Sequence, residues 1–174
     1  MQAIVLKRAD FREYDQMISL YTKEKGRQEA LARGVKKITS RNAAHLEPFC
    51  FALVEVGRGR EIDHLTKVVS IDQFSNIRND ATKSLAAGYA VSLLHLLTET
   101  GEPDVSLWHV TISWLRFVEK TDQFDALLLD SYCLAVFHCL GFSPVLDRCV
   151  VCQKSYQIMM SEDITQQKKS GIFF

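Results

Sequence analysis

The sequence predicts an α+β protein in which a small closed β-barrel is followed by an all-α helical part. Up to about residue 75, apolar residues fall in short β-rich runs separated by turns, and from Asp80 onward they recur with a helical period. The chain has 174 residues, of which 47% are apolar and 24% charged, which is enough to bury a core. The change of period predicts two domains, residues 1–78 and 79–174.

Five runs are expected to form the strands of the barrel. They are residues 3–7, 16–22, 28–33, 49–56 and 62–74. Gly26 lies in a predicted hairpin turn between the second and third runs, where a positive φ is expected. Residues 36–46 would connect the third strand to the fourth. Five strands of this length fit a small closed barrel.

Three helices are expected after the barrel. The first starts at Asp80 and ends at residues 100–103, and its predicted buried stripe is Leu85, Tyr89, Leu93 and Leu97. The second covers about residues 104–119, with a stripe of Leu107, Thr111, Trp114 and Val118. The third covers residues 124–140, and Gly141 is well placed to end it.

Charge is concentrated in one run of the barrel half, although the chain as a whole has 21 Lys and Arg against 21 Asp and Glu. The basic residues of this run are Lys23, Lys25, Arg27, Arg33, Lys36, Lys37 and Arg41. Only Glu24 and Glu29 oppose them, so the run favours an anionic partner. A phosphate backbone is the natural candidate, since Lys and Arg release counterions when they bind it. A solvated basic loop without a partner is the alternative.

Aromatic residues near the basic run add a second element of a nucleic-acid site. They are Phe11, Tyr14, Tyr21 and Phe49. Each could stack on an unpaired base, an interaction worth about 1 to 3 kcal/mol. The alternative for Tyr21 and Phe49 is that both are core residues of the barrel.

The pair Cys149 and Cys152 has the CxxC spacing of half a zinc site. Zinc needs two further ligands, and no second CxxC follows in this chain. Cys133, His138 and Cys139 precede the pair, but they fall within a predicted helix. A thioredoxin-like redox pair is disfavoured, because the CxxC does not follow a strand and open a helix. No cofactor is therefore assigned, and zinc would depend on ligands supplied from elsewhere.

No catalytic constellation is recognised, so the chain is expected not to be an enzyme. Residues 57–60, Gly-Arg-Gly-Arg, lack the Lys-Ser/Thr pair and the following helix of a phosphate loop. No apolar run reaches the roughly 18 to 20 residues of a membrane span. The first residues do not have the charge order of a secretory signal. The expected location is the cytoplasm, in association with the nucleoid.

Several motifs together resemble the RecO family of recombination mediator proteins. In the barrel half they are residues 3–7 (AIVLK), 13–15 (EYD), 20–26 (LYTKEKG), 32–37 (ARGVKK) and 46–49 (LEPF), with Ser40 and Arg41. In the helical half, residues 140–152 (LGFSPVLDRCVVC) are similar to the segment that enters the family's zinc-finger-like region. The resemblance covers both ends of the chain. It departs from the family at residues 170–174, which resemble the approach to a second cysteine pair that this chain lacks, so a form shortened at the C-terminus is expected.

The resemblance implies an N-terminal OB-fold barrel, a helical domain with a partial zinc-finger-like CxxC, and a role in DNA repair. It implies binding of single- and double-stranded DNA and annealing of complementary strands. The implied protein partners are RecR, the C-terminal tail of single-stranded DNA-binding protein and, indirectly, RecA, which the family helps to load on gapped DNA. The family's basic face maps onto Arg33, Lys36, Lys37 and Arg41. Two alternatives stay open: an OB-fold adaptor that binds protein but not DNA, and a thiol oxidoreductase using Cys149 and Cys152.

Overall fold

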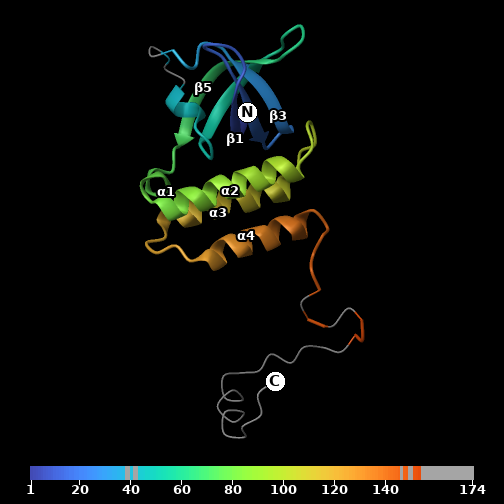
Figure 1. The fold of residues 1–174 in the computed structure, drawn as a ribbon. Coiled ribbons are helices and arrows are strands. Elements are labelled where there is room, and N and C mark those ends of the chain that lie inside the picture. Colours follow the sequence, from blue (N-terminus) through green and yellow to red (C-terminus); the bar gives the residue numbers. More distant parts are fainter. Residues whose placement is uncertain (38–39, 41–42, 146, 149–150, 154–174) are drawn as a thin grey trace, which may run out of the picture. The chain divides into compact units, whose positions relative to one another are not determined.

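The computed structural model describes residues 1–37, 40, 43–145, 147–148 and 151–153 (Figure 1). The chain divides into two compact units, residues 1–141 and 142–174. The first unit contains the strands β1 (Gln2–Asp10), β2 (Gln16–Thr22), β3 (Gly26–Ala32), β4 (Phe51–Gly57) and β5 (His64–Asp72), and a short 3-10 helix at Ala43–Leu46. Its α-helices are α1 (Ser75–Asn79), α2 (Ala81–Leu97), α3 (Val105–Lys120) and α4 (Ala126–Cys139). The expected order of strands before helices is confirmed, and α1 is an element that the sequence pattern did not predict.

The five strands close into a barrel in the order β1-β2-β3-β5-β4. Neighbouring strands run antiparallel except at the closure, where β3 lies parallel to β5. This arrangement confirms the predicted OB-type barrel. A cluster of small and branched apolar side chains fills it, including Val5, Ile18, Leu20, Val54 and Val68.

Gly26 begins β3 with the expected positive φ of +64°. The position also requires glycine for a second reason, because a Cβ there would overlap the backbone carbonyl of Glu102. Glu102 belongs to the connection between α2 and α3. The turn between β2 and β3 therefore lies against the helical part of the unit.

Each of the three long helices begins at an aspartate. The side chains of Asp80, Asp104 and Asp125 accept hydrogen bonds from backbone N–H groups of the first turn of α2, α3 and α4. An N-cap of this kind stabilises a helix by about 0.5 to 2 kcal/mol. At the other end of α4, Gly141 has φ +80°, as expected of a residue that ends a helix.

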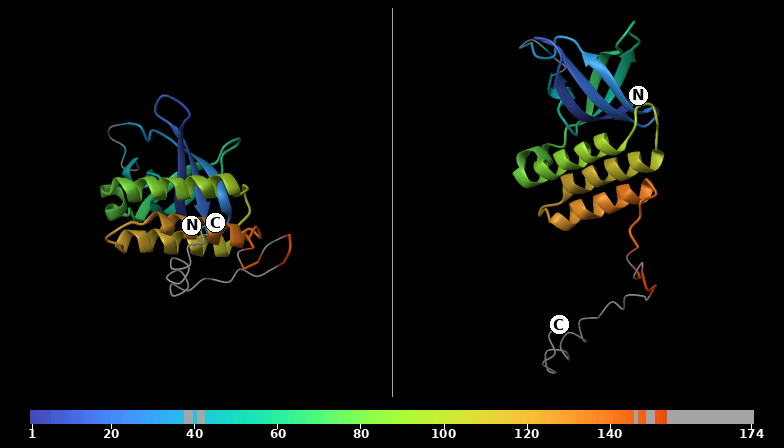
Figure 2. Two further views of the ribbon diagram at one scale, coloured as in Figure 1. Left: turned by 60° about the horizontal axis from the view of Figure 1, so that its bottom comes forward. Right: turned by 45° about the vertical axis from the view of Figure 1, so that its right-hand side comes forward.

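The predicted buried stripe of the first helix is wrong. Leu85 is 78% exposed and Tyr89 is 54% exposed, and Leu97 is also exposed. The buried residues of α2 are instead Lys83, Ala86, Ala87, Ala90, Val91 and Leu94. The reason is that α2 lies between the barrel on one side and α3 and α4 on the other (Figures 1 and 2). Small alanines permit close packing on both sides, and Leu85 and Tyr89 lie on the open flank. The predicted stripe of α3, by contrast, is buried in full.

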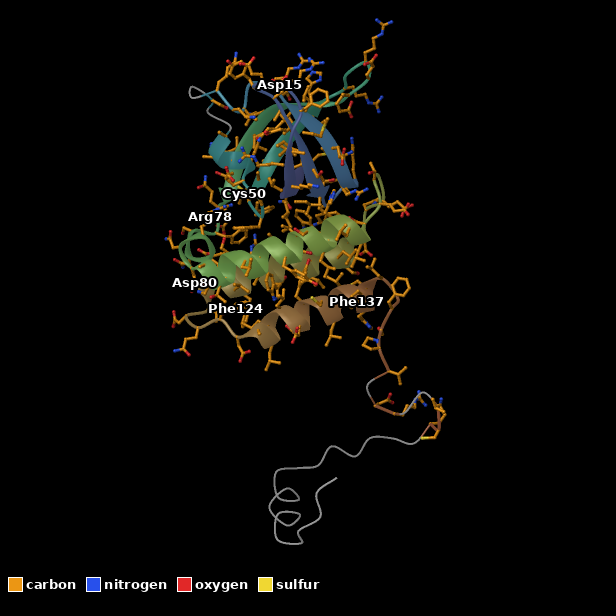
Figure 3. The ribbon with its side chains drawn as sticks, in the orientation of Figure 1. Asp15, Cys50, Arg78, Asp80, Phe124 and Phe137 are labelled. Carbon is orange, nitrogen blue, oxygen red and sulfur yellow. The ribbon has the colours of Figure 1, made fainter. Side chains whose placement is uncertain are left out.

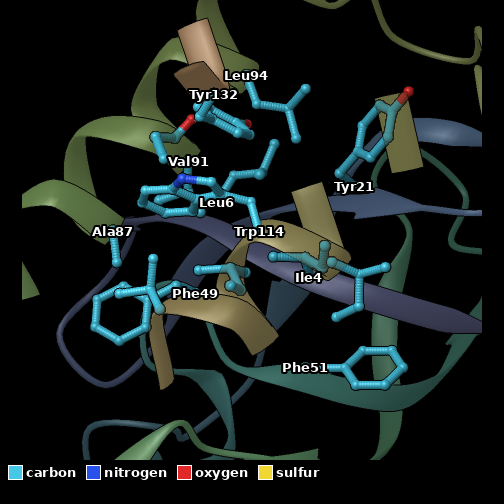
Figure 4. Packing of buried hydrophobic residues seen from close by; sticks show 14 of the residues in the cluster. Ile4, Leu6, Tyr21, Phe49, Phe51, Ala87, Val91, Leu94, Trp114 and Tyr132 are labelled. Carbon is cyan, nitrogen blue, oxygen red and sulfur yellow. The ribbon is translucent and has the colours of Figure 1, made fainter. Parts of the chain in front are cut away.

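The barrel and the helices share one hydrophobic cluster (Figure 4). Ile4, Leu6 and Phe51 from the strands lie in the same cluster as Trp108 and Trp114 of α3. The rings of Phe51 and Trp108 meet edge to face with centroids 5.9 Å apart. Strand β5 ends at Asp72 and α1 starts at Ser75, but this core crosses the boundary. A division into independent domains at residue 78 remains a prediction.

Within the described part of the chain, no helix combines the length and apolar character needed to cross a membrane.

Candidate nucleic-acid interface

One end of the barrel carries the loops that join β1 to β2 and β4 to β5, together with the segment that follows β3 (Figure 3). A shallow pocket lies among them, with Arg12, Arg33, Arg58 and Arg60 in its lining beside the aromatic ring of Phe11. We call this end of the barrel the rim and define it by Phe11, Arg12, Tyr14, Arg33, Lys37, Arg58 and Arg60. OB barrels bind oligonucleotides with these two loops and the face of strands two and three.

The segment after β3 is held against the β1–β2 loop by its backbone. The Gly34 N–H donates to Oδ1 of Asp15 at 2.7 Å, and the Lys36 N–H donates to the Tyr14 carbonyl at 3.1 Å. Val35, between them, is buried in the barrel core. These contacts place Arg33 and Lys37 at the rim, where both are exposed.

Two aromatic rings at the rim are open to solvent and lie beside cations. Phe11 is 41% exposed, and the Arg12 guanidinium carbon lies 5.2 Å from its ring centroid. Tyr14 is 46% exposed, and Nζ of Lys37 lies 5.5 Å from its ring centroid. A base can stack on such a ring while the neighbouring cation reaches its phosphate.

Asp10 and Asp63 at this end are engaged in local bonds, while Glu61 lies in the pocket lining. Asp10 accepts hydrogen bonds from Gln16 and Lys36, and these bonds, with the charge of Lys36, hold the pKa of Asp10 below its ordinary value. Asp63 accepts a hydrogen bond from the Gly59 N–H, which fixes the β4–β5 loop. By contrast, no described carboxylate forms an ion pair with Arg33, Arg58 or Arg60. Their charges are therefore available to an anionic ligand.

The predicted basic run is divided between the two ends of the barrel. Arg33, Lys36 and Lys37 lie at the rim end, whereas Lys23 and Lys25 lie in the β2–β3 turn at the other end. The seven residues of β2 separate the two groups by about 20 Å.

Arg27 also lies at the end opposite the rim, where its guanidinium donates to the carbonyl of His95 at 2.6 Å and to the Thr100 hydroxyl at 3.3 Å. It therefore joins the barrel to the end of α2. Arg41 lies outside the described residues. The six predicted residues that the structure describes do not form one cluster.

Tyr21 and Phe49 are buried, as the core alternative expects, but in the cluster shared with the helices and not in the one that fills the barrel. Sequence reasoning missed Arg12, Arg58 and Arg60. The segment 57–60 does not match a phosphate loop, and its composition alone predicts only a turn. The signal that could have identified it is its position between the fourth and fifth strands, since an OB barrel places that loop beside the β1–β2 loop.

The cysteines give no metal centre within the described residues, where no cluster of three His, Cys, Asp or Glu side chains could hold an ion. Cys149 lies outside those residues, and Cys152 is exposed. Cys50 is buried in the barrel, and burial raises the pKa of its thiol to about 11. Burial also raises the pKa of Cys133 and Cys139. Zinc binding by Cys149 and Cys152 stays a prediction.

Comparison with known proteins gives matches over most of the chain. The family model described as Recombination protein O N terminal matches residues 1–74, and the model described as Recombination protein O C terminal matches residues 78–158. Three curated proteins named DNA repair protein RecO are similar to the chain. That of Pelotomaculum thermopropionicum is 36% identical, that of Syntrophomonas wolfei 31% and that of Desulforamulus reducens 32%. The alignments cover 87%, 88% and 87% of this chain and 58%, 61% and 59% of the relatives, so the chain spans about three fifths of their length.

Proposed function

Because the chain belongs to the RecO family of DNA repair proteins, we propose that it is a non-enzymatic recombination mediator that binds DNA at the rim. In this role it binds single- and double-stranded DNA, anneals complementary strands and, with RecR, helps to load RecA on DNA covered by single-stranded DNA-binding protein. The other candidate is an OB-fold adaptor whose rim binds protein and does not bind DNA.

The observation that carries the proposal is the combination of exposed aromatic rings with arginines that have no ion-pair partner among the described residues, at one end of the barrel. Arg33, Arg58 and Arg60 can neutralise phosphates, and Phe11 and Tyr14 can stack on bases. Stacking uses the face of a base and leaves its pairing edge free. A strand held in this way can therefore meet its complement, which accounts for annealing without a catalytic step.

Salt dependence of DNA binding tests the proposal. The chain is expected to bind a fluorescein-labelled oligothymidine of about 25 nucleotides, with log K falling against log salt at a slope of about −3, as four to five phosphate contacts require. Fluorescence anisotropy at a series of salt concentrations measures the slope. An adaptor would show no anisotropy change with the oligonucleotide at low salt, and that result would remove the DNA-binding assignment.

The open flank of α2 supports a proposal for one protein contact, that with the C-terminal tail of single-stranded DNA-binding protein. A groove runs between this flank and β1, and Leu85 and Tyr89 form part of its apolar lining. Lys7, Arg8 and Arg78 also line it, and its described lining residues include no carboxylate, although Arg8 is ion-paired with Glu47 next to it. An acidic tail would match the cations of this groove, and the apolar lining could receive apolar side chains of the same tail.

Replacing Gly88 with leucine tests this contact. A Cβ at Gly88 meets no heavy atom within 4 Å, so the larger side chain should extend into the open groove without disturbing α2. Leucine also has the higher helix propensity. Binding of a labelled tail peptide, followed by anisotropy, is expected to weaken at least about tenfold, while oligothymidine binding stays the same. Gly88→Ala, which adds one methyl group, is the matched control. Equal tail affinity in all three proteins would place the contact elsewhere.

A further inference from the structure

We infer that Asp15 is a positioning residue for the DNA-binding rim, an inference that rests on the proposed function. Asp15 is the last residue of the β1–β2 loop and lies at the tip of the barrel (Figure 3). A carboxylate beside phosphate-binding cations would by its charge alone repel DNA. The hydrogen bond that the Asp15 side chain accepts indicates instead that Asp15 favours DNA binding, by fixing the backbone of the rim.

The carboxylate of Asp15 fixes the backbone between two cations of the rim. Its Oδ1 accepts the Gly34 N–H at 2.7 Å, across 19 residues of sequence. Gly34 has φ +62° and, as glycine, the widest choice of other conformations. The bond therefore selects one conformation for the most flexible residue between Arg33 and Lys37.

Two further bonds connect this conformation to the side chains of the rim. The Lys37 N–H donates to the Gly34 carbonyl at 3.1 Å, so the turn that presents Lys37 to the Tyr14 ring starts at Gly34. Backbone bonds also close the other side of the loop, where the N–H groups of Phe11 and Arg12 donate to the Asp15 carbonyl at 3.2 and 3.3 Å. Asp15 thus holds the β1–β2 loop with its main chain and the segment after β3 with its side chain.

Positioning and electrostatics predict different results for two variants that remove the same charge. Asp15→Asn keeps an oxygen that can accept the Gly34 N–H, whereas Asp15→Ala does not. If the charge alone matters, both variants bind DNA more tightly than the parent protein. If positioning matters, the alanine variant binds about fivefold more weakly and the asparagine variant binds at least as tightly as the parent protein.

The experiment measures oligothymidine binding by both variants and by the parent protein over a series of salt concentrations. We expect the slope of log K against log salt to become shallower by about 0.7 in Asp15→Ala, as one phosphate contact is lost, and to stay unchanged in Asp15→Asn. A merely structural role would not move this slope in one variant alone. Amide exchange of Gly34 gives a second readout in the folded protein and should be faster in the alanine variant only.

Three outcomes separate the inference from the proposed function. Weaker binding and a shallower slope in Asp15→Ala alone support positioning. Equal or tighter binding by both variants overturns it and leaves DNA binding at the rim intact. Absence of oligothymidine binding by the parent protein overturns the proposed function together with the inference.

Discussion

Replacing Arg58 and Arg60 with glutamate is expected to weaken binding of single-stranded DNA on the order of 100-fold at low salt. Both residues are exposed in the β4–β5 loop, and neither has an ion-pair partner among the described carboxylates. Reversal removes two phosphate contacts and adds two repulsive charges next to the bound strand. Anisotropy titration with labelled oligothymidine measures the loss, and the slope of log K against log salt should become shallower by about 1.4.

The matched control is Lys23→Glu with Lys25→Glu. It changes the net charge by the same amount on the same barrel, but in the β2–β3 turn, about 20 Å from the rim. We expect less than about threefold weakening, because screening reduces interactions beyond roughly 10 Å at 0.1 M salt. Equal losses in the two double variants would contradict a localised rim and would support the whole basic run as the contact surface.

Within the basic run, Lys37→Glu should have a larger effect than Lys36→Glu. Nζ of Lys36 already donates to Asp10 at 2.9 Å, so part of its charge is neutralised in the free protein.

Replacing Trp108 with alanine is expected to lower the free energy of unfolding by about 3 to 5 kcal/mol. Trp108 is 2% exposed and lies in the cluster that joins the strands to the helices, in edge contact with Phe51 of β4. A typical domain is stable by only about 5 to 15 kcal/mol, so the loss should be visible in any denaturant titration. Because the core is shared, the barrel and the helices are expected to unfold together.

Two probes test this cooperativity. Circular dichroism follows the helices, and alkylation of Cys50, read by mass spectrometry, follows opening of the barrel in whose core Cys50 lies. Both transitions should shift equally in Trp108→Ala. Leu85→Ala, on the exposed flank of α2, should change stability by less than about 0.5 kcal/mol. A variant that loses its helices while Cys50 stays protected would show instead that the two parts unfold as separate domains.

Local patterns predicted the elements of this protein well. The second strand is found at the predicted residues, and Asp104 and Gly141 mark helix ends close to where they were expected. The pattern failed for α2, because a four-residue spacing of Leu85, Tyr89 and Leu93 identifies an apolar face without saying what covers it. The buried residues of α2 lie on its other faces and include Ala86, Ala87 and Ala90, because α2 is packed between two layers.

The sequence by itself determined the order of strands and helices, the family and the presence of a basic segment in the barrel half. These depend on periodicity, turn residues and motifs, which are properties of neighbouring residues. Only the tertiary structure decided which cations share a surface. Closure of the barrel pairs β1 with β4 and β3 with β5, and so brings Arg58 and Arg60 beside Arg12 and Arg33. Lys23 and Lys25 lie at the opposite end of the barrel, because the two ends of an extended strand such as β2 are far apart whatever charges they carry.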